Sequence, residues 1–276
     1  MGGAWVRTTT DQSRGRINEQ LGKRGRQHVL QAGVDLTRWG NSDRGVVGVM
    51  VGTGEATERV VSQVTGYAAE GRVKGRTVGL YGSWLQNAVD DGGLYVDGWV
   101  QTARFRNSVQ GDALQRENYD SQSTSASLEA GYAFNVYAGG SSALYVEPQA
   151  QVTWSDYRMD DGRHVEVNGT EVRVADAGGI RTRLGVRLFG HTTQEDANCV
   201  QPFVAVNWIR QDAANNGVWM DDVMLSGAAP RDLYEAKVGA QVQLGRRLTA
   251  WGEVSVGRGD EDYRNYGGLL GVKYAW

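Results

Sequence analysis

Charged side chains recur at alternate positions of segments that are otherwise apolar, and these residues have the greatest potential for chemistry. Two of them, Glu129 and Glu147, could fall on neighbouring strands. Two carboxylates held close together can share a proton and serve as general acid and general base. The alternative is that both form ion pairs with arginines such as Arg181 and Arg187. We favour the ion-pair interpretation.

Other catalytic patterns are weak in this sequence. His28, His164 and His191 are scattered without the spacing of metal ligands, and no serine lies in a Gly-x-Ser-x-Gly sequence. His164 lies close to Asp160 and Asp161, in a segment that reads as a solvated loop. We therefore expect no catalytic residue, no metal site and no cofactor.

The composition excludes several classes of protein. The chain has 276 residues with 39 glycines and only three prolines, and nine tryptophans argue against disorder. The formal net charge of −3 gives no reason to expect a nucleic-acid partner. A single cysteine, Cys199, excludes a disulfide framework and is expected to be structural.

The elements that must position the charges are strands. In the segment 178–190, Ile180, Leu184 and Leu188 alternate with Arg181, Arg183 and Arg187, which is a period of two residues. The same alternation predicts an all-β chain of twelve strands. They are expected at 4–10, 28–39, 45–54, 74–86, 93–109, 122–137, 142–157, 178–191, 199–211, 232–245, 247–258 and 265–276.

Connections between these strands alternate between long and short. The long ones are expected at 10–27, 56–73, 110–121, 156–178, 212–231 and 257–265, and the short ones at 40–44, 87–93, 137–142, 191–198 and 245–247. Long loops at one end and tight turns at the other are typical of outer-membrane barrels. The apolar strand residues are too few in a row for a spanning helix, but a membrane strand needs only about 9–11 residues.

One face of the predicted strands has almost no charge, and the other has acids and bases together. Burying that second face in a dry core would cost several kcal/mol for each unpaired charge. We therefore predict a twelve-stranded antiparallel transmembrane β-barrel with its charged face toward the lumen, rather than a soluble barrel with a polar exterior. The predicted lumen-lining residues are Asp35, Asp97, Glu129, Glu147, Arg181, Arg183, Arg187, Glu235, Lys237, Glu253 and Lys273.

Aromatic residues fall mainly near the ends of the predicted strands, where they would form interfacial girdles. They include Trp39, Trp84, Trp154, Trp208, Tyr132, Phe134, Tyr234, Tyr266, Tyr274 and Trp276. Pro148 lies inside a predicted strand, and its missing N–H implies a bulge or a local break.

Six stretches, by their order and spacing, carry a family resemblance: AWVRTT, YVEPQAQVTW, GGIRTRLGVRLFG, VQPFVAVNW, EAKVGAQVQLGRRLTAWGEVSVGRGD and the closing YGGLLGVKYAW. In them the chain resembles the C-terminal β-barrel, or translocator, domain of type V autotransporters, close to the AIDA and pertactin-like group. The resemblance covers essentially the whole chain. It implies one domain, residues 1–276, in the outer membrane of a Gram-negative bacterium.

The resemblance also implies partners and a role. The barrel would support export of a passenger domain that is covalently attached upstream, and a linker helix would precede residue 1, so we expect this chain to lack both. The alternation of Leu270, Val272, Tyr274 and Trp276 in the last strand resembles the signal that the barrel-assembly machinery reads by strand addition. Periplasmic chaperones, outer-membrane lipid and lipopolysaccharide are the other expected partners, and the barrel is expected to be a monomer.

Three alternatives remain at this point. The chain could be a free-standing outer-membrane porin, an outer-membrane hydrolase with a loop site near His164, or a soluble β-barrel binding module. Some members of the family release their own passenger with acidic or Asn residues inside the barrel, so the carboxylates of this chain could do the same. We favour a translocator without catalytic activity.

Overall fold

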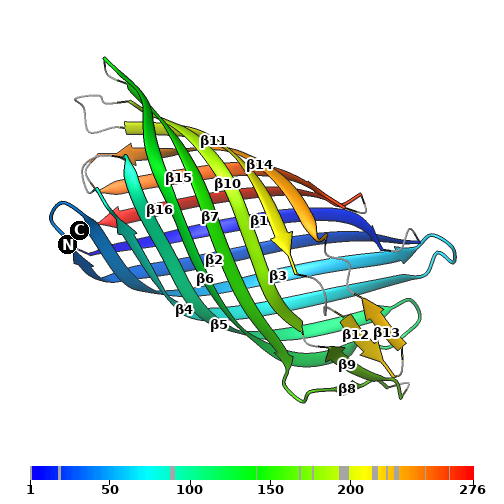
Figure 1. Cartoon of the computed structure of the whole chain (residues 1–276). Coiled ribbons are helices and arrows are strands. Elements are labelled where there is room, and N and C mark those ends of the chain that lie inside the picture. The colour runs from blue at the N-terminus through cyan, green and yellow to red at the C-terminus, as the bar shows by residue number, and fades with distance from the viewer. Residues whose placement is uncertain are drawn as a thin grey trace.

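The computed structural model describes residues 2–17, 20–87, 91–140, 142–167, 169–175, 177–192, 199–212, 217–221, 223–226, 230–245, 247–260 and 262–276. Within these ranges the regular structure consists of β-strands (Figure 1). No helix among the described residues is long and apolar enough to cross a membrane.

In the described part of the chain, twelve strands close into a barrel in the order β1-β16-β15-β14-β11-β10-β7-β6-β5-β4-β3-β2 (Figure 1). Every neighbouring pair is antiparallel, and the ring closes where β1 pairs with β16. The wall strands are β1 (Gly3–Ile17), β2 (Leu21–Trp39), β3 (Arg44–Ser62), β4 (Ala68–Leu85), β5 (Gly93–Gly111), β6 (Glu117–Gly139), β7 (Ser142–Met159), β10 (Ala177–Thr192), β11 (Cys199–Gln211), β14 (Asp232–Leu244), β15 (Leu248–Gly259) and β16 (Arg264–Ala275). The predicted all-β barrel of twelve antiparallel strands is confirmed.

Three of the predicted long connections are wrong. Residues 10–27, 56–73 and 110–121 are mostly strand, and only 18–20, 63–67 and 112–116 lie between the strands. Polar residues are frequent on both faces of the strands in these stretches, so the regular apolar alternation stops although the backbone ladder continues. With these extensions, the strands β1 to β6 are 15 to 23 residues long. The connection predicted at 257–265 is likewise shortened to residues 260–263.

Two connections at the same end of the barrel are long and contain strands of their own. β8 (His164–Val165) and β9 (Glu171–Ala175) lie between β7 and β10, and β12 (Gly217–Met220) and β13 (Val223–Ser226) lie between β11 and β14. They pair in the order β13-β12-β9-β8 and form a small sheet beside the rim (Figure 1).

The chain termini lie at the opposite end of the barrel, together with the short turns (Figure 1). Residues 40–43 join β2 to β3, and 245–247 join β14 to β15. Gly40 (φ 104°) and Gly245 (φ 69°) adopt the left-handed backbone that such turns require. The turn predicted at 191–198 falls mostly at 193–198, which lie outside the described residues.

Pro148 interrupts a ladder, as predicted. Pairing between β6 and β7 runs to Gly131–Gln149 and resumes at Phe134–Val146 in the same register. On the other side of β7, Pro148 lies opposite Val186 of β10. The proline therefore breaks pairing with one neighbour locally and causes no slip, and the irregularity of β6 lies further on, between Asn135 and Tyr137.

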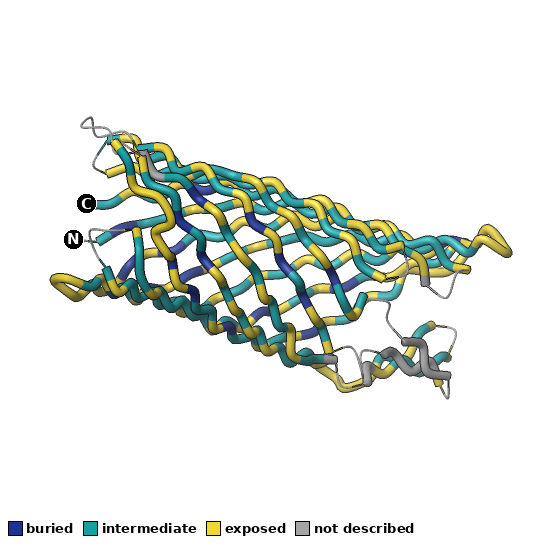
Figure 2. Tube along the Cα trace, turned by 45° about the horizontal axis from the view of Figure 1, so that its top comes forward, coloured by how far each residue is buried: buried dark blue, intermediate teal, exposed yellow. Residues whose placement is uncertain are grey.

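Burial alternates along each strand (Figure 2). On β10 the apolar Leu184 is 45% exposed on the outward face. On β7 the charged Glu147 is only 6% exposed on the other face. An apolar exterior with charges inside reverses the arrangement of a soluble protein, and it is the arrangement of a barrel that lies in lipid.

Candidate functional site: the charged interior

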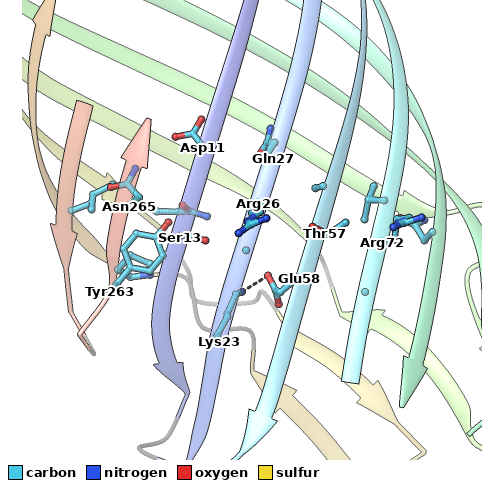
Figure 3. Close-up of a pocket in the computed structure, with 18 of the residues that line it drawn as sticks. Asp11, Ser13, Lys23, Arg26, Gln27, Thr57, Glu58, Arg72, Tyr263 and Asn265 are labelled. Carbon is cyan, nitrogen blue, oxygen red and sulfur yellow. Dashed lines mark ion pairs between the residues drawn. The ribbon is translucent and has the colours of Figure 1, made fainter. Parts of the chain in front are cut away.

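The inward face of the wall surrounds polar space. A cavity of about 710 Å³ is lined by residues from ten of the wall strands, so it lies inside the ring. Its lining includes Asp11 of β1, Arg181 of β10 and Glu235 of β14. In Figure 3 Lys23 and Glu58 meet on the lining, with their ion pair at 2.8 Å. All eleven charged residues that were predicted to line the lumen lie on the inward faces of their strands.

One group of these charges connects β5, β6, β7 and β10. Arg183 Nη2 lies 2.7 Å from Glu129 Oε2, and Tyr95 donates its hydroxyl to the other oxygen of Glu129 at 2.8 Å. Arg183 also donates through Nε to Gln151 Oε1 at 3.1 Å. Asp97 faces inward on β5, directly opposite Ser83 of β4. The carboxylate of Glu129 is thus held by an arginine and a phenol together.

A second group lies nearer to the termini. Arg187 Nη1 is 3.8 Å from Glu147 Oε1, which also accepts a hydrogen bond from Gln149 at 2.7 Å. The guanidinium of Arg187 lies 4.9 Å from the ring centroid of Phe189 and 4.4 Å from that of Phe203. Contacts of this kind are favourable when the cation is partly desolvated. Arg187 therefore joins a carboxylate to an aromatic cluster on the inner wall.

A third group is centred on Lys237 of β14. Its Nζ lies 3.0 Å from Glu253 Oε1 on β15 and 3.6 Å from Glu235 Oε1 on its own strand. Asn207 of β11 donates to Glu235 at 3.0 Å. One lysine thus bridges two acids that would otherwise repel each other.

The fourth group spans the seam where the barrel closes. Asp35 of β2 accepts hydrogen bonds from Arg38, whose Nε is at 3.0 Å, and from the hydroxyl of Tyr81 of β4 at 2.6 Å. Lys273 of β16 reaches the same carboxylate at 3.2 Å. The side chain of Asp35 is 0% exposed, so three strands share one buried anion.

This geometry agrees with the ion-pair interpretation of the acids. Glu147 pairs with Arg187 as expected, whereas Glu129 pairs with Arg183 instead of Arg181. Arg181 remains exposed on the wall of the large cavity. The two glutamates lie on the neighbouring strands β6 and β7, each with its own arginine.

The histidine candidate has a structural partner. His164 Nε2 lies 3.1 Å from Glu117 Oε2 of β6, and Val167 N donates to Glu117 Oε1 at 2.9 Å. These bonds attach the small rim sheet to the barrel, and neither Asp160 nor Asp161 takes part. Across the described ranges, no group of three or more His, Cys, Asp or Glu residues could hold a metal ion.

Several interior residues were missed from the sequence. Asp11, Lys23 and Glu58 fell in stretches that were predicted to be loops, so their inward position was not considered. Tyr81 and Tyr95 carry no charge, yet both bind predicted acids. Extending the two-residue period through the polar stretches would have found the first three.

The last strand presents its predicted residues outward. Leu270, Val272, Tyr274 and Trp276 are all exposed on the outer face of β16, with Leu270 at 67%. Tyr266 lies near the other end of the same face and is also exposed. The ten steps along the chain from Tyr266 to Trp276 would cover roughly 25 Å in a strand tilted by about 40°, which matches the apolar band of a membrane barrel.

Other aromatic residues lie where a girdle requires them. Trp84 donates its indole N–H to Asp43 in the turn at the terminal end, at 2.9 Å. Trp208 donates to Asp232 near the opposite rim, also at 2.9 Å. Each ring therefore borders the apolar band while its polar atom is satisfied. A closed β-barrel with an apolar exterior, aromatic residues at the borders of the apolar band and a charged interior is a transmembrane β-barrel.

Comparison with known proteins identifies the family. The family model for the autotransporter beta-domain matches residues 4–255. The chain is 34% identical over 284 residues to the uncharacterized protein YdeU of Escherichia coli K12, covering 99% of this chain and 60% of YdeU. It is 29% identical over 286 residues to the autotransporter adhesin AIDA-I of Escherichia coli, covering 99% of this chain and 22% of the adhesin. The solved transport unit of AIDA-I matches the structure with a TM-score of 0.90 and 29% identity, over 99% of this chain and 90% of that one.

The chain belongs to the autotransporter β-domain family. It is an integral outer-membrane barrel and serves as a translocator in type V secretion. The chain spans 60% of YdeU and 22% of AIDA-I, so it corresponds to a part of these longer relatives. The family implies a passenger domain linked to the barrel, and it is consistent with a role that is not enzymatic.

Proposed function

We propose that residues 1–276 form one translocator domain and that its passenger crosses the outer membrane through the charged interior. The observation that supports this most directly is the inverted wall, with apolar side chains such as Leu184 outside and the groups around Glu129 and Lys237 inside. A polypeptide in transit has unpaired backbone N–H and C=O groups, which need a polar route. The eleven inward-facing charged residues would line that route and keep it hydrated.

Because its charges are paired, such an interior would bind a passing polypeptide only weakly. Glu129, Glu147 and Asp35 each have a basic partner on the inner wall. Balanced charges bind a passing chain weakly, because neither sign dominates the potential along the wall. A translocator has to accept passengers of varied sequence without retaining them.

The proposed orientation follows from the connections. Outer-membrane barrels have short periplasmic turns and longer external connections. The end with the termini would therefore face the periplasm, and the rim with β8, β9, β12 and β13 would face outward. A passenger attached ahead of β1 would then enter the lumen from the periplasm.

The proposed partners follow from the last strand and the exterior. Leu270, Val272, Tyr274 and Trp276 would be read by the barrel-assembly machinery as an extended strand, after periplasmic chaperones have kept the chain unfolded. The completed barrel would be a monomer surrounded by outer-membrane lipid and lipopolysaccharide.

Surface display tests the proposed function. A passenger with an epitope tag would be fused ahead of residue 1 and produced in a Gram-negative host. We expect protease added to whole cells to remove the epitope, since the passenger would be outside. The matched control is the same passenger fused to an unrelated porin, which should leave the epitope protected. An epitope that stays protected although this barrel is folded and in the outer membrane would contradict the proposal.

A further inference from the structure

The outward face of the barrel has a row of arginines that its own fold does not explain. Cross-strand pairing places Arg258 opposite Arg264, Arg264 opposite Arg14, Arg14 opposite Arg24, and Arg24 opposite Arg59. These five residues, the arginine row, come from the five neighbouring strands β15, β16, β1, β2 and β3, and all are exposed. The row is bounded by Tyr234 at one end and Glu70 at the other.

The facing of the arginine row follows from its strands. Arg258 shares the face of β15 that bears Val254 and Val256, and Arg264 shares the face of β16 that bears Tyr266 and Leu270, all of them exposed outward. The row therefore lies on the outside of the wall and not in the lumen. It is at the end of the barrel opposite the termini.

Such a row is unfavourable by itself. Directly opposed residues on neighbouring strands have Cβ atoms about 4.5–5.5 Å apart, and like charges in that position destabilise a sheet. The row contains four such pairs in succession. None of its arginines has an ion-pair partner within the described part of the chain, whereas nearby Arg16 pairs with Asp262 at 3.4 Å. Two further basic pairs, Arg76–Arg104 and Lys74–Arg106, extend the basic surface onto β4 and β5.

The arginine row crosses the border of the apolar band at an angle. Arg258 directly follows Val256 on the outward face of β15, so it adjoins the apolar surface. On β3, the outward residues Thr53, Glu55 and Thr57 separate Arg59 from Val51. The distance of the guanidinium groups from the apolar band therefore increases along the row from Arg258 to Arg59.

We propose that the arginine row binds the phosphate groups of lipopolysaccharide in the outer leaflet. This inference depends on the orientation given under the proposed function. Guanidinium groups bind phosphate in a bidentate manner, and two arginines on adjacent strands can hold one phosphate between them. Basic clusters beside a membrane-spanning surface recognise anionic lipid headgroups. The arginines next to the apolar band meet the phosphates of lipid A, and those further out meet the phosphates of the core sugars.

The experiment uses the folded barrel purified in a zwitterionic detergent. Lipid A, lipid A without its phosphates, and inorganic phosphate are titrated separately, and affinity is measured from bound-state masses in native mass spectrometry. Each basic side chain at an anionic surface strengthens binding about fivefold. The triple variant Arg14→Gln, Arg24→Gln, Arg264→Gln should therefore bind lipid A roughly 100-fold more weakly than the unaltered barrel. Dephosphorylated lipid A should bind both proteins alike, and inorganic phosphate alone should bind far more weakly than lipid A.

Arg210→Gln is the matched control. Arg210 is also exposed on the outward face near the same rim, but its cross-strand neighbour is Asp232, so it is outside the arginine row. This variant should keep its affinity for lipid A. A second readout needs no ligand: without lipid A, the triple variant should melt at a temperature equal to or above that of the unaltered barrel, because repulsion has been removed.

Equal lipid A affinity in the triple variant and in Arg210→Gln would overturn the proposal, as would a lower melting temperature of the triple variant in lipid-free detergent. Passenger display in the same cells separates this inference from the proposed function. If the unaltered barrel displays its passenger but does not bind lipid A, only the arginine row is refuted. If it binds lipid A but does not display the passenger, only the translocator role is refuted.

Discussion

At the scale of single residues, many of the inward charges of the barrel have a partner of opposite charge on another strand. Asp35 is the clearest case, since Arg38, Tyr81 and Lys273 all bind its fully buried carboxylate. The sequence predicted that Asp35 and Lys273 share a face but could not pair them, because β2 and β16 meet only through β1 after the ring has closed. Which charges pair depends on the order of the strands around the barrel, and the two-residue alternation in the sequence does not contain that information.

Removing the carboxylate of Asp35 should be costly. Asp35→Ala would leave Arg38 and Lys273 close together without their shared anion, and breaking a buried ion pair costs about 3–5 kcal/mol. Tyr81→Phe removes one hydrogen bond to the same charged group and should cost less, about 1.5–3 kcal/mol. Urea-induced unfolding of the barrel in lipid vesicles measures both. Similar losses for the two variants would mean that the aspartate charge has little importance.

The two faces of β10 should respond differently to charge. Leu184 is the middle member of the outward series from Ile180 to Leu188, so Leu184→Arg should lower the free energy of unfolding in lipid by about 2–4 kcal/mol. Arg183→Ala, one residue away on the inward face, should have a milder effect because water in the lumen can solvate Glu129. Vesicle unfolding again provides the measurement, and equal effects would contradict the assigned faces.

At the scale of elements, the sequence predicted every wall strand but underestimated the lengths of β1 to β6. Val78 and Leu80 mark β4 as a membrane strand, whereas Glu70 and Arg72 on the same face fell in the loop predicted at 56–73. The strand continues because its backbone hydrogen bonds to β3 and β5 do not depend on which side chains face the solvent. The small rim sheet could not be predicted from the local pattern either, since β9 and β12 are far apart in the sequence and lie in two different connections.

The last strand offers a test at this scale. Deletion of Trp276, or Tyr274→Asp, should reduce the amount of assembled barrel in the outer membrane, because both changes alter the outward face that the assembly machinery would read. Heat-modifiable mobility of outer-membrane fractions on gels measures assembly. Lys273→Gln, on the inward face of the same strand, is the control and should assemble normally. Unchanged mobility after deletion of Trp276 would show that the signal lies elsewhere.

At the scale of the whole molecule, the inverted distribution of polarity decides how the protein behaves in solution. Outward residues such as Leu270, Val206 and Val254 are more than half exposed, so they have no protein to cover them. We expect the folded chain to require detergent and to elute from gel filtration as a monomer in its micelle. A monodisperse monomer in detergent-free buffer would refute the membrane assignment.

Closure of the ring by β1 and β16 has a consequence for how the protein is made. The pairs from Gly3–Ala275 to Arg14–Arg264 join residues that are 250 to 272 positions apart in the sequence, and contacts between residues so far apart form slowly. β16 must be synthesised before the seam can form, and until then β1 has an unpaired edge that favours aggregation. Closure of the barrel therefore has to wait for its last strand, and we expect the pairing of β1 with β16 to be a slow step of folding.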